Sequence, residues 1–464
     1  MPKLVSSRRC LHSQVIEKMA RWIELLAVSL LLAVSVRGTC DCPAGDCTCI
    51  AEDPLGYDAR FEICHLFTRQ APHRVAISST GRKFVCFPCS FDAQNTNDGC
   101  NGKIQVAEVT PNGELPYPNY CINNPPRGVI NRACCPAAAF PYADFFISVE
   151  SLKILNDYLW CMDSGRPLDC TTQVLLEATG GTKVVVINTC SNSVVRIYEL
   201  PLTVALPTSL CKDIAIDTCN KKAYIADAGC PALIVLDIVD GTSYRLLAGD
   251  PSVSPVCGNI AYVWGQAQYW LTKCGDCTTV GFIPYGIYAL ALSPDCGRLY
   301  FIDMGDRKLY SVCTSSLQTP GAANSDILPT LINHGEVGKT LGLAADCQTG
   351  VVWFGNAEAN AVGYFNPCCP FSKTNILIRD KRVAWSEGVC IPGDGYCYII
   401  DSHFNGIPSI YPGTGPLFSE RRKCPFVLWR FKLPCAADLC PNPCAPATLG
   451  YYPPGGCTAC SVCS

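Results

Sequence analysis

Short stretches in which apolar and polar residues alternate recur along the chain, each followed by a tight turn and a second apolar stretch. Residues 285–312, "YGIYALALSPDCGRLYFIDMGDRKLYSV", have this form, with Asp, Cys and Gly in the turn and aromatic residues in the second strand. The pattern is typical of an antiparallel β-hairpin. Five other segments repeat it, at 73–88, 145–165, 212–229, 339–366 and 386–407.

The six hairpins predict an all-β fold, a six-bladed β-propeller in which each hairpin is the inner half of a blade. A four-stranded blade cannot cover both of its apolar faces, so blades stack radially around a channel. Helical patterns are nearly absent outside the N-terminal segment, whereas 35 prolines and 37 glycines occur at strand-and-turn spacing.

Composition narrows the class of protein. With 464 residues, 49% hydrophobic and 16% charged, the chain can bury a large core. The net charge of -3 and the absence of a Lys/Arg cluster leave little to neutralise a phosphate backbone, so nucleic acid is not an expected partner. Thirty-five cysteines suit an oxidising compartment, where they form crosslinks.

The N-terminus agrees with secretion. From Met19 the chain has Arg21, an apolar run over 25–36 and small residues near Gly38, as in a secretory signal peptide. We expect a signal peptide over 1–38, with Met19 as its start and residues 1–18 either a longer leader or a start-site artefact. Cleavage would remove Cys10 and leave an even number of cysteines, as full pairing requires. No second apolar stretch reaches membrane-spanning length, so we expect a soluble, extracellular protein.

Two flanking segments differ from the hairpins. Residues 39–60 and 434–464 are rich in cysteine and poor in large apolar residues, so disulfides must order them. The expected organisation is therefore a cysteine-rich N-terminal segment, a propeller over 61–433 and a cysteine-rich tail. The tail could bind protein partners.

The cysteines are expected to be structural. CxxC spacing at four places, "CGDC" among them, would also suit zinc or a thioredoxin-like centre. The oxidising compartment and the absence of a βαβ pattern favour disulfides. Strand spacing predicts the pairs Cys296 with Cys313, Cys347 with Cys368 or Cys369, and Cys390 with Cys397.

Carboxylates and aromatic residues are predicted to meet at one end of the channel. Turns after the second strands of a propeller lie on the same face as the residues that lead into the inner strands. An acidic, aromatic mouth suits a cationic or polyhydroxylated small molecule. The candidate residues are Phe146, Asp163, Asp213, Asp227, Tyr285, Asp303, Thr340, Glu387, Asp401, His403 and the 355–360 turn.

Other interpretations of these residues stay open. Each aspartate also suits a turn cap whose carboxylate accepts local N–H groups. Converging carboxylates and Asn360 could hold calcium, although no Asp-x-Asp-x-Asp loop is present, and no other cofactor is expected. His403 could act as a base at the mouth or be an ordinary loop histidine. No nucleophile elbow, phosphate loop or His-Glu-x-x-His motif is present.

Four segments, in this order, resemble the Yellow / major royal jelly protein family. They are "LWCMDSG" (159–165), "DIAIDTCNKKAYIADAG" (213–229), "YGIYALALSP" (285–294) and "VVWFGNAEANAVGYFN" (351–366). The resemblance spans roughly 60–410 and implies a secreted six-bladed propeller. In amine-binding members the ligand lies at the channel mouth, which implies Asn356, Asn360 and Phe365 as pocket residues.

Three functions are compatible with these patterns. The first is a secreted protein that binds a small aromatic amine or catechol-type ligand at the channel mouth. The second is an isomerase acting on dopachrome-like substrates in a pigment (melanin) pathway, for which one carboxylate or His403 could move the proton. The third is a disulfide-crosslinked extracellular structural or storage protein. A calcium-dependent lactonase of the same architecture ranks below these.

Overall fold

The computed structural model describes residues 56–97, 101–124, 142–166, 180–274, 277–368, 375–435 and 439. These residues belong to one compact unit, Gly56–Ser464. The expected signal peptide and most of the two cysteine-rich segments lie outside the described residues. Among the described residues, no helix is long and apolar enough to cross a membrane.

The unit is all-β and contains six four-stranded antiparallel sheets. The sheets are numbered in chain order of the strand that begins each predicted hairpin, from β2 to β26. Sheets 1 to 3 are β2 (Arg74–Ile77), β3 (Lys83–Cys86), β4 (Val106–Thr110) and β5 (Gly113–Pro116); β6 (Val149–Leu155), β7 (Tyr158–Asp163), β8 (Lys183–Asn188) and β9 (Ser193–Glu199); β10 (Cys211–Asp217), β11 (Lys222–Asp227), β12 (Ala232–Asp237) and β13 (Ser243–Leu246). Sheets 4 to 6 are β18 (Ile287–Leu292), β19 (Arg298–Asp303), β20 (Lys308–Cys313) and β21 (Ile332–Glu336); β22 (Leu343–Ala345), β23 (Val352–Asn356), β24 (Ala361–Phe365) and β25 (Asn375–Arg379); β26 (Ser386–Cys390), β27 (Tyr396–Asp401), β29 (Phe426–Lys432) and β1 (Glu62–Phe67). All six predicted hairpins are the first two strands of a sheet.

Short elements outside the sheets lie in the connections. They are β14 (Tyr262–Val263), β15 (Gln266–Ala267), β16 (Tyr269–Cys274), β17 (Cys277–Gly281), β28 (Ile410–Tyr411), α2 (Tyr120–Asn123) and α3 (Asn324–Ile327). β16 pairs with both β17 and β28, so the segment before sheet 4 is tied to the segment after β27.

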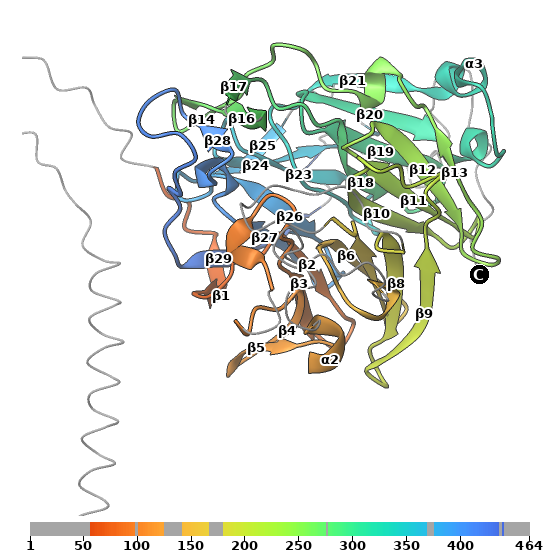
Figure 1. Ribbon diagram of the computed structural model, residues 1–464, viewed down its shortest axis with the longest axis horizontal. Helices are drawn as coiled ribbons and strands as arrows, with labels where there is room; N and C mark the ends of the chain where they lie inside the picture. Colours follow the sequence, from red (N-terminus) through yellow and green to blue (C-terminus); the bar gives the residue numbers. More distant parts are fainter. Residues whose placement is uncertain are drawn as a thin grey trace, which may run out of the picture. The chain divides into compact units, whose positions relative to one another are not determined.

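The six sheets form a closed circle of contacts. Their first strands, called the inner strands below, contact one another in chain order from β2 to β26, and β26 contacts β2. In Figure 1 the labelled inner strands β2, β6, β10, β18 and β26 lie toward the middle, whereas the fourth strands β5, β9, β13 and β21 lie further out. Sheet 6 joins the two ends of the described chain, because β1 pairs with β29 along its whole length.

One apolar cluster fills each junction between neighbouring sheets. Strand β11 has an almost continuously apolar sequence, and its packing on both faces explains why. Tyr224 and Ala226 pack toward sheet 4, whereas Ala223 and Ile225 pack toward sheet 2. Because alternate side chains of a strand point to opposite faces, a sheet with both faces covered needs apolar residues at every position.

Candidate functional site

Four of the six inner strands carry a β-bulge at their second residue. In β6 the register with the neighbouring strand shifts between Val149 and Ser151, and the same shift occurs in β10, β18 and β26. A bulge re-aims the side chain of the extra residue and is frequent beside functional sites. The bulge residues are Glu150, Lys212, Tyr288 and Glu387, all of them buried.

These four side chains meet two residues at the start of β2. The axial cluster is defined as His73, Arg74, Glu150, Lys212, Tyr288 and Glu387. Tyr288 Oη donates to Glu387 Oε1 (3.1 Å), and His73 Nδ1 lies 2.7 Å from Glu387 Oε2. Arg74 Nη1 donates to Leu341 O (2.8 Å). Since sheets 4 and 6, and sheets 1 and 5, are not neighbours in the circle, these contacts place the cluster at its centre.

Lys212 shows that the cluster can hold a cation. Its ammonium group is paired with Glu150. The same nitrogen lies 5.0 Å from the ring centroid of Phe91 and 5.1 Å from that of Tyr288. A carboxylate combined with aromatic faces is the arrangement that stabilises ammonium groups away from water.

The charges of the axial cluster compensate one another. Burial by itself raises the pKa of Glu387, but nearby His73, Arg74 and Lys212 outweigh this effect and bring the pKa to about 2. Glu387 is therefore ionised at neutral pH. Burial raises the pKa of Tyr288, which keeps the phenol protonated as a hydrogen-bond donor.

Aromatic side chains from several separate segments cover the cluster. Phe91, from the β3–β4 connection, lies 4.6 Å from Tyr285 and 5.1 Å from Trp270 between ring centroids. Phe404, which follows β27, lies 5.7 Å from Trp385. These five residues are called the aromatic cover. All but Tyr285 are less than a tenth exposed.

His73 retains an unused polar atom between the cluster and the cover. Its ring lies edge-on to Phe404 at 5.4 Å, and the residue is 3% exposed. Its Nδ1 faces Glu387, whereas its Nε2 finds no hydrogen-bond partner among the described residues. Buried polar atoms without partners are uncommon in native proteins, so this nitrogen is a candidate ligand contact.

Three of the predicted mouth aspartates accept hydrogen bonds from backbone N–H groups just before an inner strand. Asp163 accepts hydrogen bonds from the backbone N–H groups of Ile147 and Ser148, both at 2.9 Å. Asp227 and Asp401 bind the backbone just before β10 and β26 in the same way. Their carboxylates fasten the end of the second strand to the start of the inner strand.

Asp303 occupies the equivalent position in sheet 4 without the equivalent bonds. It is 1% exposed, and neither carboxylate oxygen has a hydrogen-bond partner among the described residues. Burial and the nearby Asp306 raise its pKa well above the ordinary value, whereas Lys339 and Lys308 act in the opposite sense.

The predicted residues of sheet 5 stabilise their own turn. Asn356 donates to Val337 O (2.8 Å) and accepts from Ala359 N (3.0 Å). Asn360 has a left-handed backbone (φ 50°) and donates to Val383 O (2.9 Å). Thr340, just before the inner strand β22, is buried and donates to Gly338 O (3.2 Å).

Phe365 and Phe146 lie elsewhere. Phe365 pairs with Val352 at the start of β23, whereas Asn356 is at the end of β23, so Phe365 is at the opposite end of sheet 5 from the mouth. The expectation overlooked that the third strand runs away from the mouth. Phe146 is buried in the apolar cluster between sheets 1 and 2 with Phe84.

Of the remaining predicted residues, two lie at the centre. Glu387 belongs to the axial cluster, and Tyr285 belongs to its aromatic cover. His403 lies further out: its Nε2 is 3.9 Å from Asp401 Oδ1, and its ring is 5.9 Å from that of Trp264. Asp213 is buried beside the cluster and accepts from Ser151 Oγ (2.6 Å) and from the backbone of sheet 4.

The sequence contained a signal for the residues that were missed. Glu150, Lys212 and the His73–Arg74 pair are charged or titratable residues at the start of otherwise apolar strands. Asp213 was predicted at the mouth as a residue at the entry of its inner strand, but the bulge in β10 lies one residue earlier, at Lys212.

The predicted disulfide between Cys296 and Cys313 is not formed. Cys313 is disulfide-bonded, but Cys296 is not its partner. Cys313 pairs in register with Arg298 on β19, whereas Cys296 lies in the preceding turn and faces sheet 3. Cys347, Cys390 and Cys397 are unbonded in the structure, and Cys369 is outside the described residues, so the pairings of Cys347 with Cys368 or Cys369 and of Cys390 with Cys397 remain predictions.

A known protein family matches the part of the chain that carries most of this site. The profile described as major royal jelly protein matches residues 147–403, more than half of the chain. The chain therefore belongs to the major royal jelly protein family. All four bulge residues lie within the matched segment, whereas His73 and Arg74 lie before it.

Individual relatives are distant. The chain is 27% identical to major royal jelly protein 7 of Apis mellifera over 229 residues, 47% of each protein, so the match spans about half of that relative. Among solved structures, a catalytically inactive virginiamycin B lyase from Staphylococcus aureus is 12% identical, with a TM-score of 0.39, and covers 80% of this chain and 100% of its own. A PQQ-bound aldose sugar dehydrogenase from Streptomyces coelicolor is 11% identical, with a TM-score of 0.37, and covers 80% of this chain and 97% of its own.

Proposed function

We propose that this protein is a secreted, Yellow-like six-bladed β-propeller that binds a small aromatic amine or catechol-type ligand at the channel mouth. The six sheets in a closed circle support the blade count, and family membership together with the N-terminal apolar segment supports secretion. The cysteine-rich segments at 39–60 and 434–464 are extensions of the propeller in this proposal.

The observation that carries the ligand class is the environment of the Lys212 ammonium group. It lies between a carboxylate and two aromatic faces, which is what a ligand ammonium requires. A second carboxylate, Glu387, is kept ionised at the same centre. An arylalkylamine would place its ammonium near Glu387 and His73 and its ring among the residues of the aromatic cover.

Binding in this position requires movement of the aromatic cover. Phe91 and Phe404 are buried and pack over the cluster, so a ligand must displace at least one of them. Both belong to connections between strands, which move more readily than the sheets. The resulting affinity is the energy of the ligand contacts less the cost of opening the cover.

Calorimetric titration with dopamine and serotonin tests the proposal. The wild-type protein should bind at least one of them, and Glu387→Gln should bind it roughly 10- to 100-fold more weakly, because a charged hydrogen-bond acceptor is lost. Glu108→Gln is the matched control, since Glu108 pairs with Arg82 on the outer part of sheet 1. Absence of heat from folded wild-type protein, or equal weakening by both substitutions, would contradict the proposal.

A second candidate function is dopachrome isomerisation, and the pair of His73 with Glu387 favours it. An imidazole whose Nδ1 is oriented by a carboxylate and whose Nε2 is unused can accept and return a proton. The test is the rate of dopachrome colour loss with wild-type protein and with His73→Gln. Equal rates with and without wild-type protein would exclude this function while leaving amine binding intact.

A further inference from the structure

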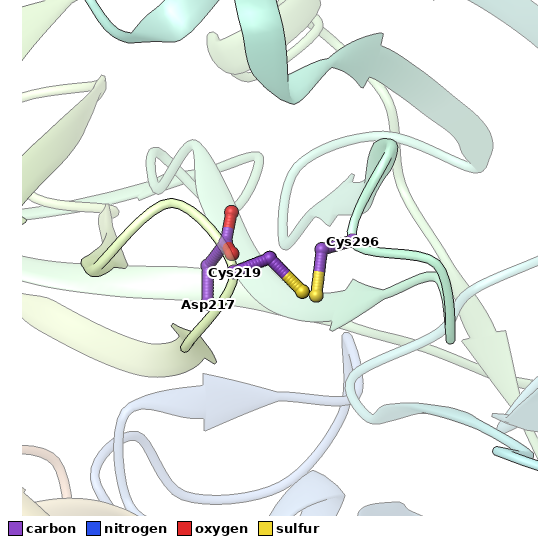
Figure 2. Close-up of side chains that lie close together, drawn as sticks. All are labelled: Asp217, Cys219 and Cys296. Atoms are coloured by element: carbon purple, nitrogen blue, oxygen red, sulfur yellow. The ribbon is translucent and has the colours of Figure 1, made fainter. Parts of the chain in front are cut away.

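Two cysteines from neighbouring sheets meet at the end of the inner strands opposite the axial cluster. Cys219 lies in the turn between β10 and β11, and Cys296 lies in the turn between β18 and β19. Figure 2 shows their two sulfur atoms pointing toward each other, with the Asp217 carboxylate beside them. One ligand atom of each of these three residues lies within 4.8 Å of the others.

The backbone at Cys296 is unusual for a cysteine. Its φ is +56°, in the left-handed region that favours glycine, asparagine and aspartate. The turn between β22 and β23 of sheet 5 also has a residue with a left-handed backbone, and there it is a glycine, Gly350 (φ 72°). Cys296 is also 8% exposed, so its thiol is held in a fixed, nearly buried place against the neighbouring sheet.

The carboxylate beside the sulfurs is already engaged. Asp217 is fully buried and accepts hydrogen bonds from Asn220 N (2.8 Å), Asn220 Nδ2 (2.7 Å) and Tyr224 Oη (2.9 Å). A structural zinc site needs four ligands, usually with deprotonated sulfurs. Burial, contact with Cys219 and the Asp217 charge all raise the pKa of the Cys296 thiol, which disfavours the thiolate. Among the described residues the group of possible metal ligands has three members, and its one carboxylate is already engaged, so the two facing sulfurs suit a covalent bond better than a metal.

We propose that Cys219 and Cys296 form a disulfide that joins the inner hairpins of sheets 3 and 4. Each thiol loses one proton and one electron as the S–S bond forms, and a small-molecule or protein disulfide is the oxidant, reduced in turn to two thiols. The link closes the junction between these sheets at the end away from the axial cluster. It depends on the proposed secretion for its oxidant but is independent of ligand binding.

Peptide mapping of the full-length wild-type protein, refolded with oxidised glutathione, tests this directly and does not require secretion. The tryptic peptide 213–221, "DIAIDTCNK", contains Cys219 as its single cysteine. After denaturation with iodoacetamide and no reductant, this peptide should be found joined to the tryptic peptide 274–298, which contains Cys274, Cys277 and Cys296. Further cleavage with chymotrypsin after Tyr288 should leave the link on the part that contains Cys296, and reduction should release it. Alkylated Cys219, a link from Cys219 to a different cysteine, or zinc in the native mass spectrum would overturn the proposal.

Three variants and a control test the proposed bond further. Cys219→Ser should make Cys296 reactive toward iodoacetamide, and Cys296→Ser should do the same for Cys219. The double variant should unfold at the same temperature as either single variant, because each alone already removes the bond. Cys347→Ser, in the equivalent turn of sheet 5, is the control and should leave the 213–221 peptide crosslinked. If the decrease in unfolding temperature in the double variant equalled the sum of the decreases in the two single variants, a bond between the two cysteines would be contradicted.

Discussion

Asp163 and Asp303 hold the same position in two sheets but have opposite surroundings. Each is the last residue of a second strand, β7 and β19, and the two are 0% and 1% exposed. Asp163 accepts backbone hydrogen bonds and pairs with Lys183 Nζ at 3.0 Å. Asp303 receives no hydrogen bond from the described residues. Equal burial therefore gives one carboxylate with backbone and lysine partners and one carboxyl group whose pKa is raised.

The path of the preceding segment explains the missing backbone bonds. The positions that correspond to Ile147 and Ser148 are Tyr285 and Gly286, since Ile287 pairs with Asp303. Gly286 N donates instead to Ala228 O (3.0 Å) of sheet 3. A Cβ at Gly286 would lie 2.1 Å from Val253 O, so only glycine permits this close approach.

A neighbouring aspartate explains the missing lysine. Lys183 is directly opposite Asp163 in β8, and Lys308 begins β20 in the corresponding place. The Lys308 ammonium lies 3.4 Å from Asp306 Oδ2 instead. A hairpin motif thus determines where an aspartate lies, whereas its hydrogen-bond and ion-pair partners depend on residues that the motif does not specify.

The largest effect is expected from Asp163→Asn. The amide cannot pair with Lys183, which is 0% exposed and would keep an uncompensated charge in the core. Breaking a buried pair in this way costs about 3–5 kcal/mol of the free energy of unfolding. Urea denaturation at pH 7 measures it. A loss below about 1 kcal/mol would mean that Lys183 finds another partner.

Glu387→Gln should destabilise the protein less, by roughly 1.5–3 kcal/mol, the value of hydrogen bonds to a charged group. The amide can still accept from Tyr288 and Trp385 Nε1, but the charge facing His73, Arg74 and Lys212 is lost. Because the folded pKa is lowered from 4.5 to about 2, this stability is present above pH 4.5 and is lost as the pH falls toward 2. The variant should therefore lack that part of the acid dependence in denaturation curves measured from pH 5 to 2.

Asp303→Asn should have the opposite sign at neutral pH. A raised folded pKa adds stability that is fully present below the unfolded value of 3.8 and is lost as the pH rises toward the folded value. Asparagine cannot ionise and so avoids this loss, although its own buried amide is left unpaired at some cost. We therefore expect the free energy of unfolding at pH 7 to rise by about 1–2 kcal/mol. The gain should vanish near pH 4. A variant that is less stable than wild type at both pH values would contradict an uncharged Asp303.

The sequence revealed the hairpins because their information is local. Alternation, turn residues and aromatic second strands gave all six inner hairpins at their observed places, as in 212–229 for β10 and β11. The outermost strand of sheet 6 could not be foreseen, because β1 and β29 are more than 350 residues apart. The pairing of two strands so far apart in the chain produces no periodic pattern in the sequence.

The site was harder to predict because it depends on register and strand direction. Glu387, predicted as a residue of the channel mouth, lies in the axial cluster, whereas Lys212 in the same cluster was not predicted, and its neighbour Asp213 was named instead. Phe365 was misplaced because β24 runs away from the mouth. Cys296 was paired within its own sheet, whereas its sulfur faces Cys219 of sheet 3. Each error concerns where a side chain points, which requires the packed sheets.

The smallest effect is expected from His403→Asn, a change that isolates the cap from its neighbour. Asp401 is satisfied by the backbone N–H groups of Ala384, Trp385 and His403 itself, and the imidazole lies 3.9 Å away and partly exposed. Asparagine tolerates the left-handed backbone at this position (φ 49°) and keeps the N–H group. Stability at pH 7 should change by no more than about 0.5 kcal/mol, as for surface substitutions. A loss comparable to that of Asp163→Asn would show that Asp401 needs a cationic partner as Asp163 does, and that backbone donors alone do not stabilise a buried aspartate.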